Sequence, residues 1–240
     1  MATTAMLRTE DGEMALYDVE PEGRARAAVV VVQEAFGVND HIEDVTRRFA
    51  AVGYRAVAPH LFYRTGDPVL DYGNIEKLMP HFQALTQEGI LADLEACFGY
   101  LASAGWTLRQ TGIVGFCMGG TVSFLAAARK ALGAGVTFYG GGVTEGRFGM
   151  PSMVELAPGL ETPWLGLYGD QDQGIPVEQV ESLREALSTA PVPTEIVRYS
   201  GAGHGFHCDA RDSYHEASAK DAWRRTLSWF DEYLAGPADR

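Results

Sequence analysis

The sequence has few basic residues and no long apolar run. Lysine and arginine together number 19, against 32 aspartates and glutamates, which gives a net charge of −13 at pH 7. Nucleic acid and anionic membrane surfaces repel so acidic a chain, so neither is expected as a partner. The longest aliphatic stretch, Ala27 to Val32, is far shorter than the ~20 residues that a membrane-spanning helix needs.

Cysteine is also scarce. The three cysteines, Cys97, Cys117 and Cys208, are an odd number, and none belongs to a Cys-x-x-Cys pair or a tandem Cys/His spacing. A disulfide framework and a metal site are therefore not expected. Residues 1–20 carry several acidic side chains and no apolar run, which is unlike a secretory signal peptide. We expect a cytoplasmic protein.

The length and composition are those of a folded chain. With 240 residues, 46% hydrophobic and 21% charged, disorder is excluded. A chain of this length buries about 70–75% of the surface that its unfolded form exposes, which is enough to build a shaped pocket without disulfides. We find no internal repeat, linker or low-complexity segment, and we expect residues 1–240 to form a single domain.

Short β-branched or aromatic runs alternate with longer amphipathic segments along the chain. The run 27–33 contains four valines and no charge, as a strand buried on both faces should. Further strands are expected at 54–58, 111–116, 135–139, 164–168 and 194–199, and helices at 40–52, 90–103, 118–132, 177–187 and 213–234. This alternation predicts an α/β fold with a mostly parallel central sheet and helices on both faces.

Two segments depart from the alternation. Residues 1–20 suit an antiparallel hairpin at the edge of the sheet, with Met14, Leu16 and Val19 as its apolar positions. Residues 60–89 show no long period, because Gly66, Pro68, Gly73 and Pro80 break any long element, so we expect an irregular, lid-like excursion over the body of the fold. Ligands of such sheets bind beyond the carboxyl ends of the strands, so the loops there are the places to search.

The clearest chemical signal lies between a predicted strand and a predicted helix, in the segment Gly115-Phe116-Cys117-Met118-Gly119-Gly120. This is the nucleophile-elbow pattern with cysteine in place of serine. Larger residues two positions before and after the nucleophile would collide with neighbouring backbone, which explains the glycines. The segment lacks the Lys-Ser/Thr pair of a phosphate loop and the glycine spacing of a dinucleotide site, so no cofactor is expected.

The partners of such a nucleophile follow in the order acid, then histidine. Asp170 and Asp172 come after one predicted strand, and His204 and His207 come after the next. Asp172 is favoured because Asp170 directly follows the strand and suits a turn, whereas Asp172 lies where a loop can reach an imidazole. His204 is favoured because glycines flank it. We expect His207 at the pocket rim or on the surface.

Together these residues resemble the dienelactone hydrolase family, the cysteine-dependent members of the α/β-hydrolase fold. The resemblance extends over nearly the whole chain and rests on Gln33-Glu34-Ala35-Phe36-Gly37-Val38-Asn39, on the elbow, on Gly169-Asp170-Gln171-Asp172 with Ile175-Pro176, and on Gly201-Ala202-Gly203-His204-Gly205-Phe206.

The family resemblance implies a role for each of the matching residues. Cys117 is implied as the nucleophile, His204 as the base and Asp172 as the group that orients it. Glu34 is implied to contact the resting thiol. The backbone N–H groups of Ala35 and Met118 are implied to form the oxyanion hole.

The chain departs from the family pattern in the residues that bind the free carboxylate of the family's substrate. The family is expected to hold that group with two arginines, one of them four residues after the histidine, where this chain has Cys208. No arginine lies between Arg64 and Arg109, and Lys77 is the cation of that segment. We therefore expect a pocket with less to offer an anionic substrate. Candidate substrate-binding residues, each with a core position as the alternative, are Phe36, Phe82, Tyr139, Phe206 and Cys208.

These observations predict a hydrolase that cleaves a lactone or activated ester through a Cys-His-Asp triad and a thioester. The substrate is expected to be a small molecule, and the chain a monomer or small homo-oligomer. Three alternatives stay open: a broad carboxylesterase or thioesterase, a non-catalytic binder of a small ligand, and a thiol redox sensor that couples Cys117 to Cys208.

Overall fold

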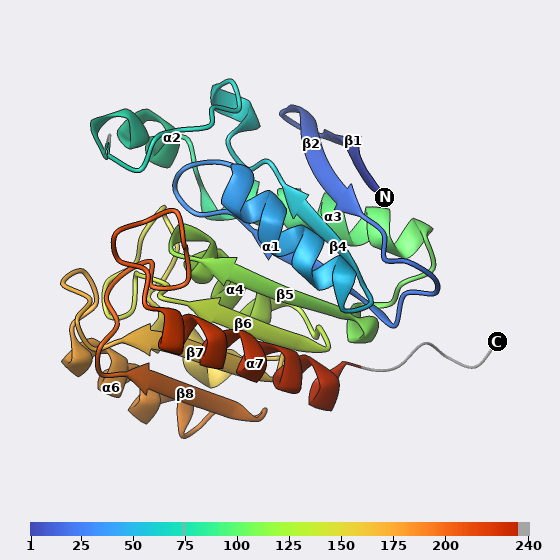
Figure 1. The fold of residues 1–240 in the computed structure, drawn as a ribbon. Helices are drawn as coiled ribbons and strands as arrows, with labels where there is room; N and C mark the ends of the chain where they lie inside the picture. The colour runs from blue at the N-terminus through green and yellow to red at the C-terminus, as the bar shows by residue number, and fades with distance from the viewer. Residues whose placement is uncertain (74, 235–240) are drawn as a thin grey trace.

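The computed structural model describes residues 1–73 and 75–234, and Figure 1 shows its arrangement. A single eight-stranded sheet runs through these residues in the order β1-β2-β4-β3-β5-β6-β7-β8. Its first two strand pairs, β1 with β2 and β2 with β4, are antiparallel, and the rest are parallel. The strands are β1 (Ala2–Thr9), β2 (Gly12–Val19), β3 (Ala27–Val32), β4 (Tyr54–Pro59), β5 (Thr111–Phe116), β6 (Ala134–Phe138), β7 (Trp164–Gly169) and β8 (Thr194–Tyr199).

Helices cover both faces of the sheet. In Figure 1, α1 and α7 lie in front of it, and rings of Phe49 on α1 and of Trp223 and Phe230 on α7 pack together. The helices α3, α4, α5 and α6 form the layer on the other face. The helices are α1 (Asp40–Ala51), α2 (Met79–Gln83), α3 (Gln87–Ser103), α4 (Met118–Arg129), α5 (Met153–Leu156), α6 (Val177–Leu187) and α7 (Glu216–Tyr233).

The predicted architecture is confirmed, including the antiparallel hairpin near the N-terminus. All six residues of β3 are buried, as the valine run indicated, because helices cover the sheet on both sides there. The hairpin pairs Leu16 of β2 with Pro59 of β4 and so extends the parallel sheet by two strands. Met14 and Leu16 are buried against the core.

The expected helix ends differ from the observed ends by three residues at three places. α3 begins at Gln87 rather than at 90, because the side chain of Thr86 caps it. α7 begins at Glu216 rather than at 213, because His215 caps it by accepting a hydrogen bond from the backbone N–H of Ser218. α4 ends at Arg129 rather than at 132, because Lys130 adopts an extended backbone. The N-terminus of α1 is capped by Asn39, whose side chain accepts from the N–H of Ile42.

Two long connections carry short helices that periodicity did not indicate. Within the expected excursion at 60–89, the described residues form the 3₁₀ turns η1 (Tyr63–Thr65) and η2 (Ile75–Leu78) and the helix α2; residue 74 of that prediction lies outside the described residues. Arg64 ties this segment down through two hydrogen bonds to the buried Asp93 of α3. The connection 140–159 contains α5 and the 3₁₀ turn η4 (Ala157–Gly159).

The turn from β5 into α4 is the tightest approach of backbone to backbone in this part of the fold. A Cβ at Gly115 would lie 1.8 Å from the carbonyl oxygen of Gly119, and one at Gly119 would lie 2.4 Å from the carbonyl oxygen of Val32 on β3. A Cβ at Gly120 would meet the Cα of Gly140 at 2.8 Å. The three glycines are therefore required by the packing of this turn.

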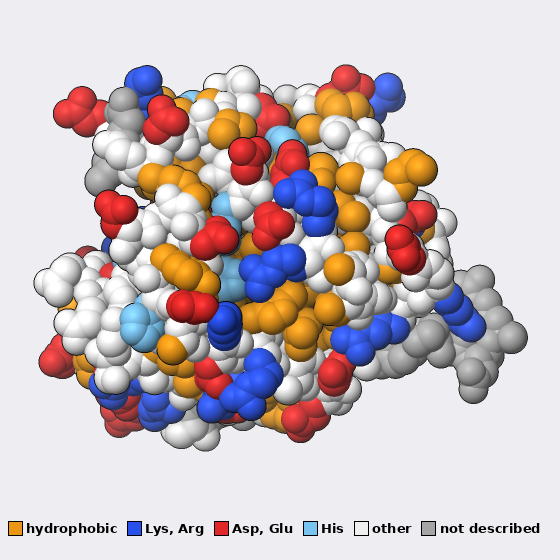
Figure 2. All heavy atoms as spheres, viewed as in Figure 1, with side chains coloured by type: hydrophobic (Ala, Val, Ile, Leu, Met, Phe, Trp, Pro, Cys, Tyr) orange, Lys and Arg blue, Asp and Glu red, His pale blue; other side chains and the backbone are white. Residues whose placement is uncertain are grey.

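The surface in Figure 2 carries acidic and basic side chains interspersed rather than gathered by sign. Some of these charges pair, as do Arg26 with Asp231 and Arg47 with Glu43. Among the described residues, no helix combines the length and the apolar character that a membrane crossing requires.

The glycine requirement can be tested by a matched pair of alanine substitutions. Gly119→Ala should lower the free energy of unfolding by about 3 kcal/mol or more, because backbone must shift to admit the methyl group. Gly99→Ala is the control: Gly99 is exposed in α3 with nothing within 4 Å of its would-be Cβ, so alanine should stabilise by about 0.5–1 kcal/mol. Urea denaturation measures both, and equal effects would contradict the account.

Candidate active site

Cys117 stands at the apex of the turn between β5 and α4. Its backbone is in the left-handed region at φ 54°, and it is the N-cap residue of α4. The Cys117 N–H donates to the carbonyl of Phe138 at 3.0 Å, which fixes the turn against β6. The thiol is thus held at the carboxyl edge of the sheet and at the positive end of a twelve-residue helix.

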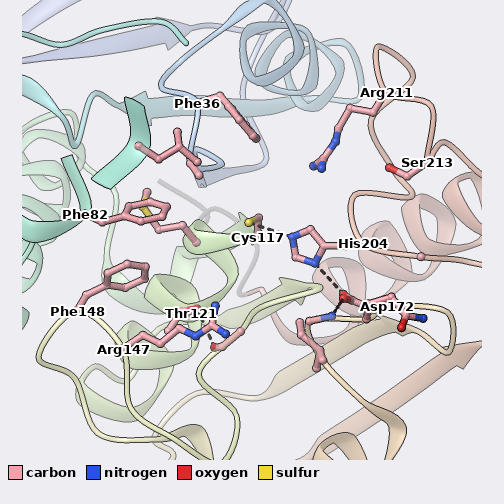
Figure 3. A pocket seen from close by; sticks show the side chains of 18 of the residues that line it. Phe36, Phe82, Cys117, Thr121, Arg147, Phe148, Asp172, His204, Arg211 and Ser213 are labelled. Carbon is pink, nitrogen blue, oxygen red and sulfur yellow. Dashed lines mark hydrogen bonds and ion pairs between the residues drawn. The ribbon is translucent and has the colours of Figure 1, made fainter. Parts of the chain in front are cut away.

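A chain of hydrogen bonds leads from the thiol to a buried carboxylate, and Figure 3 draws it as dashed lines. Cys117 Sγ lies 3.1 Å from Nε2 of His204, and Nδ1 of His204 lies 2.7 Å from Oδ2 of Asp172. The Asp172 carboxylate is 2% exposed, and its other oxygen accepts from the N–H of Gly174 at 2.9 Å. The three side chains come from the loops after β5, β7 and β8.

The neighbouring aspartate has a different partner. Asp170 accepts a hydrogen bond from Nε of Arg198 at 2.8 Å and takes no part in the chain to the thiol. Of the two aspartates, Asp172 is therefore the one in hydrogen-bond contact with His204.

The surroundings of His204 favour its charged form. Burial lowers the pKa of His204, but the charge of the Cys117 thiolate, the hydrogen bonds to Asp172 and Cys117, and the charge of Asp172 outweigh burial. Together they raise the pKa from 6.5 to about 10. The site thus favours the imidazolium form of His204, the form that results when the imidazole accepts a proton.

Glu34 is fully buried beside the site and faces an arginine. Its Oε1 accepts from Nη1 of Arg211 at 3.3 Å and from the hydroxyl of Tyr139 at 3.5 Å. Its Oε2 is buried and has no hydrogen-bond partner among the described residues. The recorded hydrogen bond of the Cys117 sulfur goes to His204 instead, so the contact of Glu34 with the thiol stays a prediction.

Ala35 and Met118 flank the thiol. Both are buried and line the same pocket as Cys117. Met118 is the first residue of α4, so its N–H has no intrahelical acceptor and is free to bind a ligand atom.

The pocket over Cys117 has a volume of about 590 Å³. This is in the range of small-molecule sites. Of the predicted substrate-binding residues, Phe36 and Phe82 lie in its wall. Further lining side chains come from η2, from α4 and from the loops after β6, β7 and β8. They include Leu78 and Ile175, together with Thr121, Arg147, Phe148 and Arg211, which Figure 3 labels.

Three residues predicted to bind substrate lie behind the pocket wall instead. Tyr139 is fully buried, with its ring 5.2 Å from that of His204. Phe206 is also fully buried and packs on Tyr139 and Tyr199. Cys208 is buried with its sulfur 3.2 Å from the hydroxyl of Tyr72. Their core position, the alternative reading of the sequence, is the one observed.

His207 also differs from expectation, since it lies neither at the rim nor on the surface. Its ring packs between Phe116 and Phe138 at 5.2 and 4.9 Å, beneath the elbow. Burial lowers its pKa well below 6.5, so His207 is neutral.

The pocket has more positive charge to offer an anionic substrate than the two missing family arginines led us to expect. Arg147 and Arg211 both line it, although neither stands where the family pattern has an arginine. Arg211 lies in the loop before α7, and Arg147 lies in the connection after β6, a segment in which the sequence shows no period to orient its side chains. Phe148 was missed for the same reason.

The described residues contain no cluster of three or more His, Cys, Asp or Glu side chains arranged to hold a metal ion. All three cysteines are free thiols, and Cys97 is buried within α3, where burial raises its pKa.

A mostly parallel sheet with a sharp strand-to-helix turn at its centre and partner loops at the carboxyl ends of later strands defines the α/β-hydrolase fold. The model of the dienelactone hydrolase family matches residues 14–234. The chain therefore belongs to the dienelactone hydrolase family and is a hydrolase of the carboxylic ester and lactone class.

Individual relatives agree with this membership. A provisionally named carboxymethylenebutenolidase of Salmonella typhimurium is 42% identical over 230 residues, which are 94% of this chain and 85% of that protein. A provisionally named dienelactone hydrolase of Klebsiella pneumoniae, solved as a crystal structure, is 39% identical with a TM-score of 0.89 over 97% of this chain and 99% of that one. A dienelactone hydrolase-like promiscuous phosphotriesterase from metagenomic libraries, 22% identical with a TM-score of 0.76, shares the fold.

The origin of the raised His204 pKa can be tested by removing the sulfur. In Cys117→Ala the negative charge that does most to raise the pKa is absent, so the pKa of His204 should fall below its wild-type value of about 10. Histidine NMR titration measures the pKa, with the His204→Gln spectrum to assign the signal and Cys97→Ala as the control. A His204 pKa that is the same in Cys117→Ala and wild type would contradict the assignment.

Proposed function

We propose that this member of the dienelactone hydrolase family cleaves lactones or activated esters through a triad of Cys117, His204 and Asp172 and a covalent thioester. The observation that carries the proposal is the unbroken hydrogen-bond chain from Sγ to the buried carboxylate, at the base of a pocket large enough for a small-molecule ester. Because the nucleophile, base and orienting acid stand in hydrogen-bond contact, the proton of the thiol has a direct path to His204.

The first half-reaction makes the thioester. The thiol proton passes to Nε2 of His204, and the thiolate attacks the carbonyl carbon of the ester. The N–H groups of Met118 and Ala35 are the proposed donors to the tetrahedral oxyanion, each worth about 3–4 kcal/mol in an oxyanion hole. When the intermediate collapses, the C–O bond breaks and the leaving oxygen takes the proton from His204.

The second half-reaction releases the acid. His204, now neutral and held by Asp172, removes a proton from a water molecule that attacks the thioester carbonyl. The C–S bond breaks, and the sulfur recovers its proton from His204. With a lactone, the alcohol or enol end stays attached to the acyl chain until this step.

The nucleophile favours particular leaving groups. A thiolate is a better leaving group than an alkoxide, so the tetrahedral intermediate with a plain alkyl ester returns to substrate. An enolate or aryl oxide leaves far more readily. We therefore propose enol-lactones and aryl esters as substrates in preference to alkyl esters and amides.

Glu34 is proposed to restrain the resting thiol. A buried carboxylate oxygen without a partner is costly, and the unpartnered Oε2 of Glu34 supports a role as acceptor for the S–H in a second orientation of the thiol. The negative charge of Glu34 also disfavours a thiolate, and Arg211 offsets only part of that charge. Binding of a substrate that displaces the thiol from Glu34 would release the thiolate.

The single domain over 1–240, the lid-like action of the 60–89 segment, the monomeric or small-oligomeric state and the cytoplasmic location remain predictions from the sequence. They are independent of the proposed chemistry.

The nucleophile is tested by substitution. Cys117→Ala should lower kcat/KM for an aryl ester at least about 1,000-fold, since the nucleophile is lost and only substrate binding and the oxyanion donors remain. Cys97→Ala, which removes a buried thiol of α3, is the matched control. Turnover in Cys117→Ala within tenfold of wild type would refute the proposal.

The role of Glu34 is tested by thiol reactivity. Glu34→Gln removes the negative charge while keeping the side-chain shape, so the rate of Cys117 alkylation by iodoacetamide at pH 7 should rise several-fold. Peptide mass spectrometry reports which cysteine reacts, and Glu232→Gln on the exposed side of α7 serves as the control. An alkylation rate in Glu34→Gln equal to that of wild type between pH 6 and 9 would sink the idea.

A further inference from the structure

The pocket has two unlike sides, which Figure 3 shows on opposite sides of Cys117. His204 and Arg211 stand on one side. Phe82, Phe148 and Arg147 stand on the other, and the proposed chemistry gives none of these three a role. The second side therefore needs an explanation of its own.

Two aromatic rings form that side. The ring centroids of Phe82, on α2, and Phe148, in the connection after β6, are 5.1 Å apart at an interplanar angle of 57°. Phe82 also contacts the buried ring of Phe62 at 6.5 Å, which anchors the pair to the core. Both phenylalanines are only half-buried, so each keeps a ring surface for a ligand. Aromatic pairs of this geometry add a third ring favourably.

The backbone at Phe148 is strained in a way that points to function. Its φ is 56°, in the left-handed region, and the next residue, Gly149, is also at positive φ. A bulky residue in this region is destabilising, and such residues cluster at ligand sites. Glycine or asparagine would relieve the strain, so the chain retains an aromatic side chain here at a cost in stability.

Arg147 supplies a positive charge beside the rings. Its guanidinium lies over Gly141, where a Cβ would be only 2.8 Å from Nη1, so the glycine makes room for it in the pocket. Within residues 1–73 and 75–234, no carboxylate lies at ion-pair distance from Arg147, whereas Arg211 is bound to Glu34. Arg147 is thus the pocket arginine whose charge is available to a ligand.

The proton transfer from His204 determines which part of a substrate lies against Phe82, Phe148 and Arg147. The leaving oxygen must face Nε2 of His204 to take its proton, so the leaving group lies on the His204 side of Cys117. The acyl substituent diverges from the leaving group at the tetrahedral carbon and points the other way, toward Phe82, Phe148 and Arg147. The cavity of about 590 Å³ has room for both groups.

We infer that the side formed by Phe82, Phe148 and Arg147 is the acyl subsite, and that it takes an aromatic acyl group with an anionic substituent at its far end. The aromatic ring packs on the two phenylalanines, and the anion binds Arg147. The inference rests on the proposed function, because it assumes an acyl transfer to Cys117.

The test varies the acyl group at a constant leaving group. The probes are the p-nitrophenyl esters of acetate, benzoate and 4-carboxybenzoate, together with the methyl ester of the last, and the readout is nitrophenolate release. We expect wild-type kcat/KM to be at least tenfold higher for 4-carboxybenzoate than for acetate. Phe148→Leu should lower the benzoate-to-acetate ratio about fivefold. Arg147→Gln should lower the ratio of 4-carboxybenzoate to its methyl ester about tenfold.

A second probe separates the acyl end from the leaving end. In 4-carboxyphenyl acetate the same carboxyaryl group is on the leaving oxygen, and Arg147→Gln should change the kcat/KM for it no more than it changes that for phenyl acetate. Arg129→Gln, at the end of α4, is the control for loss of a positive charge and should change none of the ratios.

Each outcome has one meaning. A flat acyl series in an active wild type, or an Arg147→Gln effect that follows the leaving group, overturns the acyl subsite while the triad chemistry stands. If wild type releases no nitrophenolate from any ester, the proposed function and the subsite fail together.

Discussion

The close approach of α4 to β3 sets the position of everything in the site. The backbone of Gly119 lies against the carbonyls of Val32 and Gln33, so the first turn of α4 packs directly on the edge of the sheet. Cys117, which links β5 to that helix, must then adopt φ 54° to make the bend. The strain is held by the surrounding sheet, and it aims the thiol out of the sheet edge into the pocket. The loops after β7 and β8 bring their partners to the same edge.

Electrostatics at the site depend on buried groups of alternating sign. Hydrogen bonds connect the buried Asp172 to His204 and His204 to the thiol. Beside them, the buried Glu34 pairs with the half-buried Arg211. Because these groups are shielded from water, each charge acts strongly on its neighbours. A change at one of them, such as a substrate anion that competes for Arg211, therefore alters the electrostatic environment of the thiol.

The sequence predicted the framework well, because local rules govern it. Buried β-branched runs and amphipathic helices predict the bounds of β5, β8 and α6 as the structure has them. The order of loops after strands predicts Asp172 and His204 as partners, and their side chains are in hydrogen-bond contact. The start of α7 was predicted three residues early, because turns at Tyr214 and His215, which bond back to Arg211 and Phe206, precede it. Hydrophobic periodicity does not predict such turns.

The pocket wall was predicted poorly, because it depends on how loops fold over the sheet. An aromatic residue after a strand points either into the pocket or into the core, and Tyr139 and Phe206 point into the core. His207 lies beneath the elbow because Phe116 and Phe138 leave room for a neutral ring there. Arg147 and Phe148 come from a connection without periodicity. Only the tertiary structure shows that this connection faces Cys117.

The measurement that tests the account most directly is the mass of the enzyme caught during turnover. Wild type mixed with an aryl ester, quenched in acid within milliseconds and digested, should carry the acyl group as a thioester on the peptide that contains Cys117. The adduct should disappear as substrate is exhausted. An acyl group found on a different residue, or a burst of phenol release with Cys117 unmodified, would contradict the account.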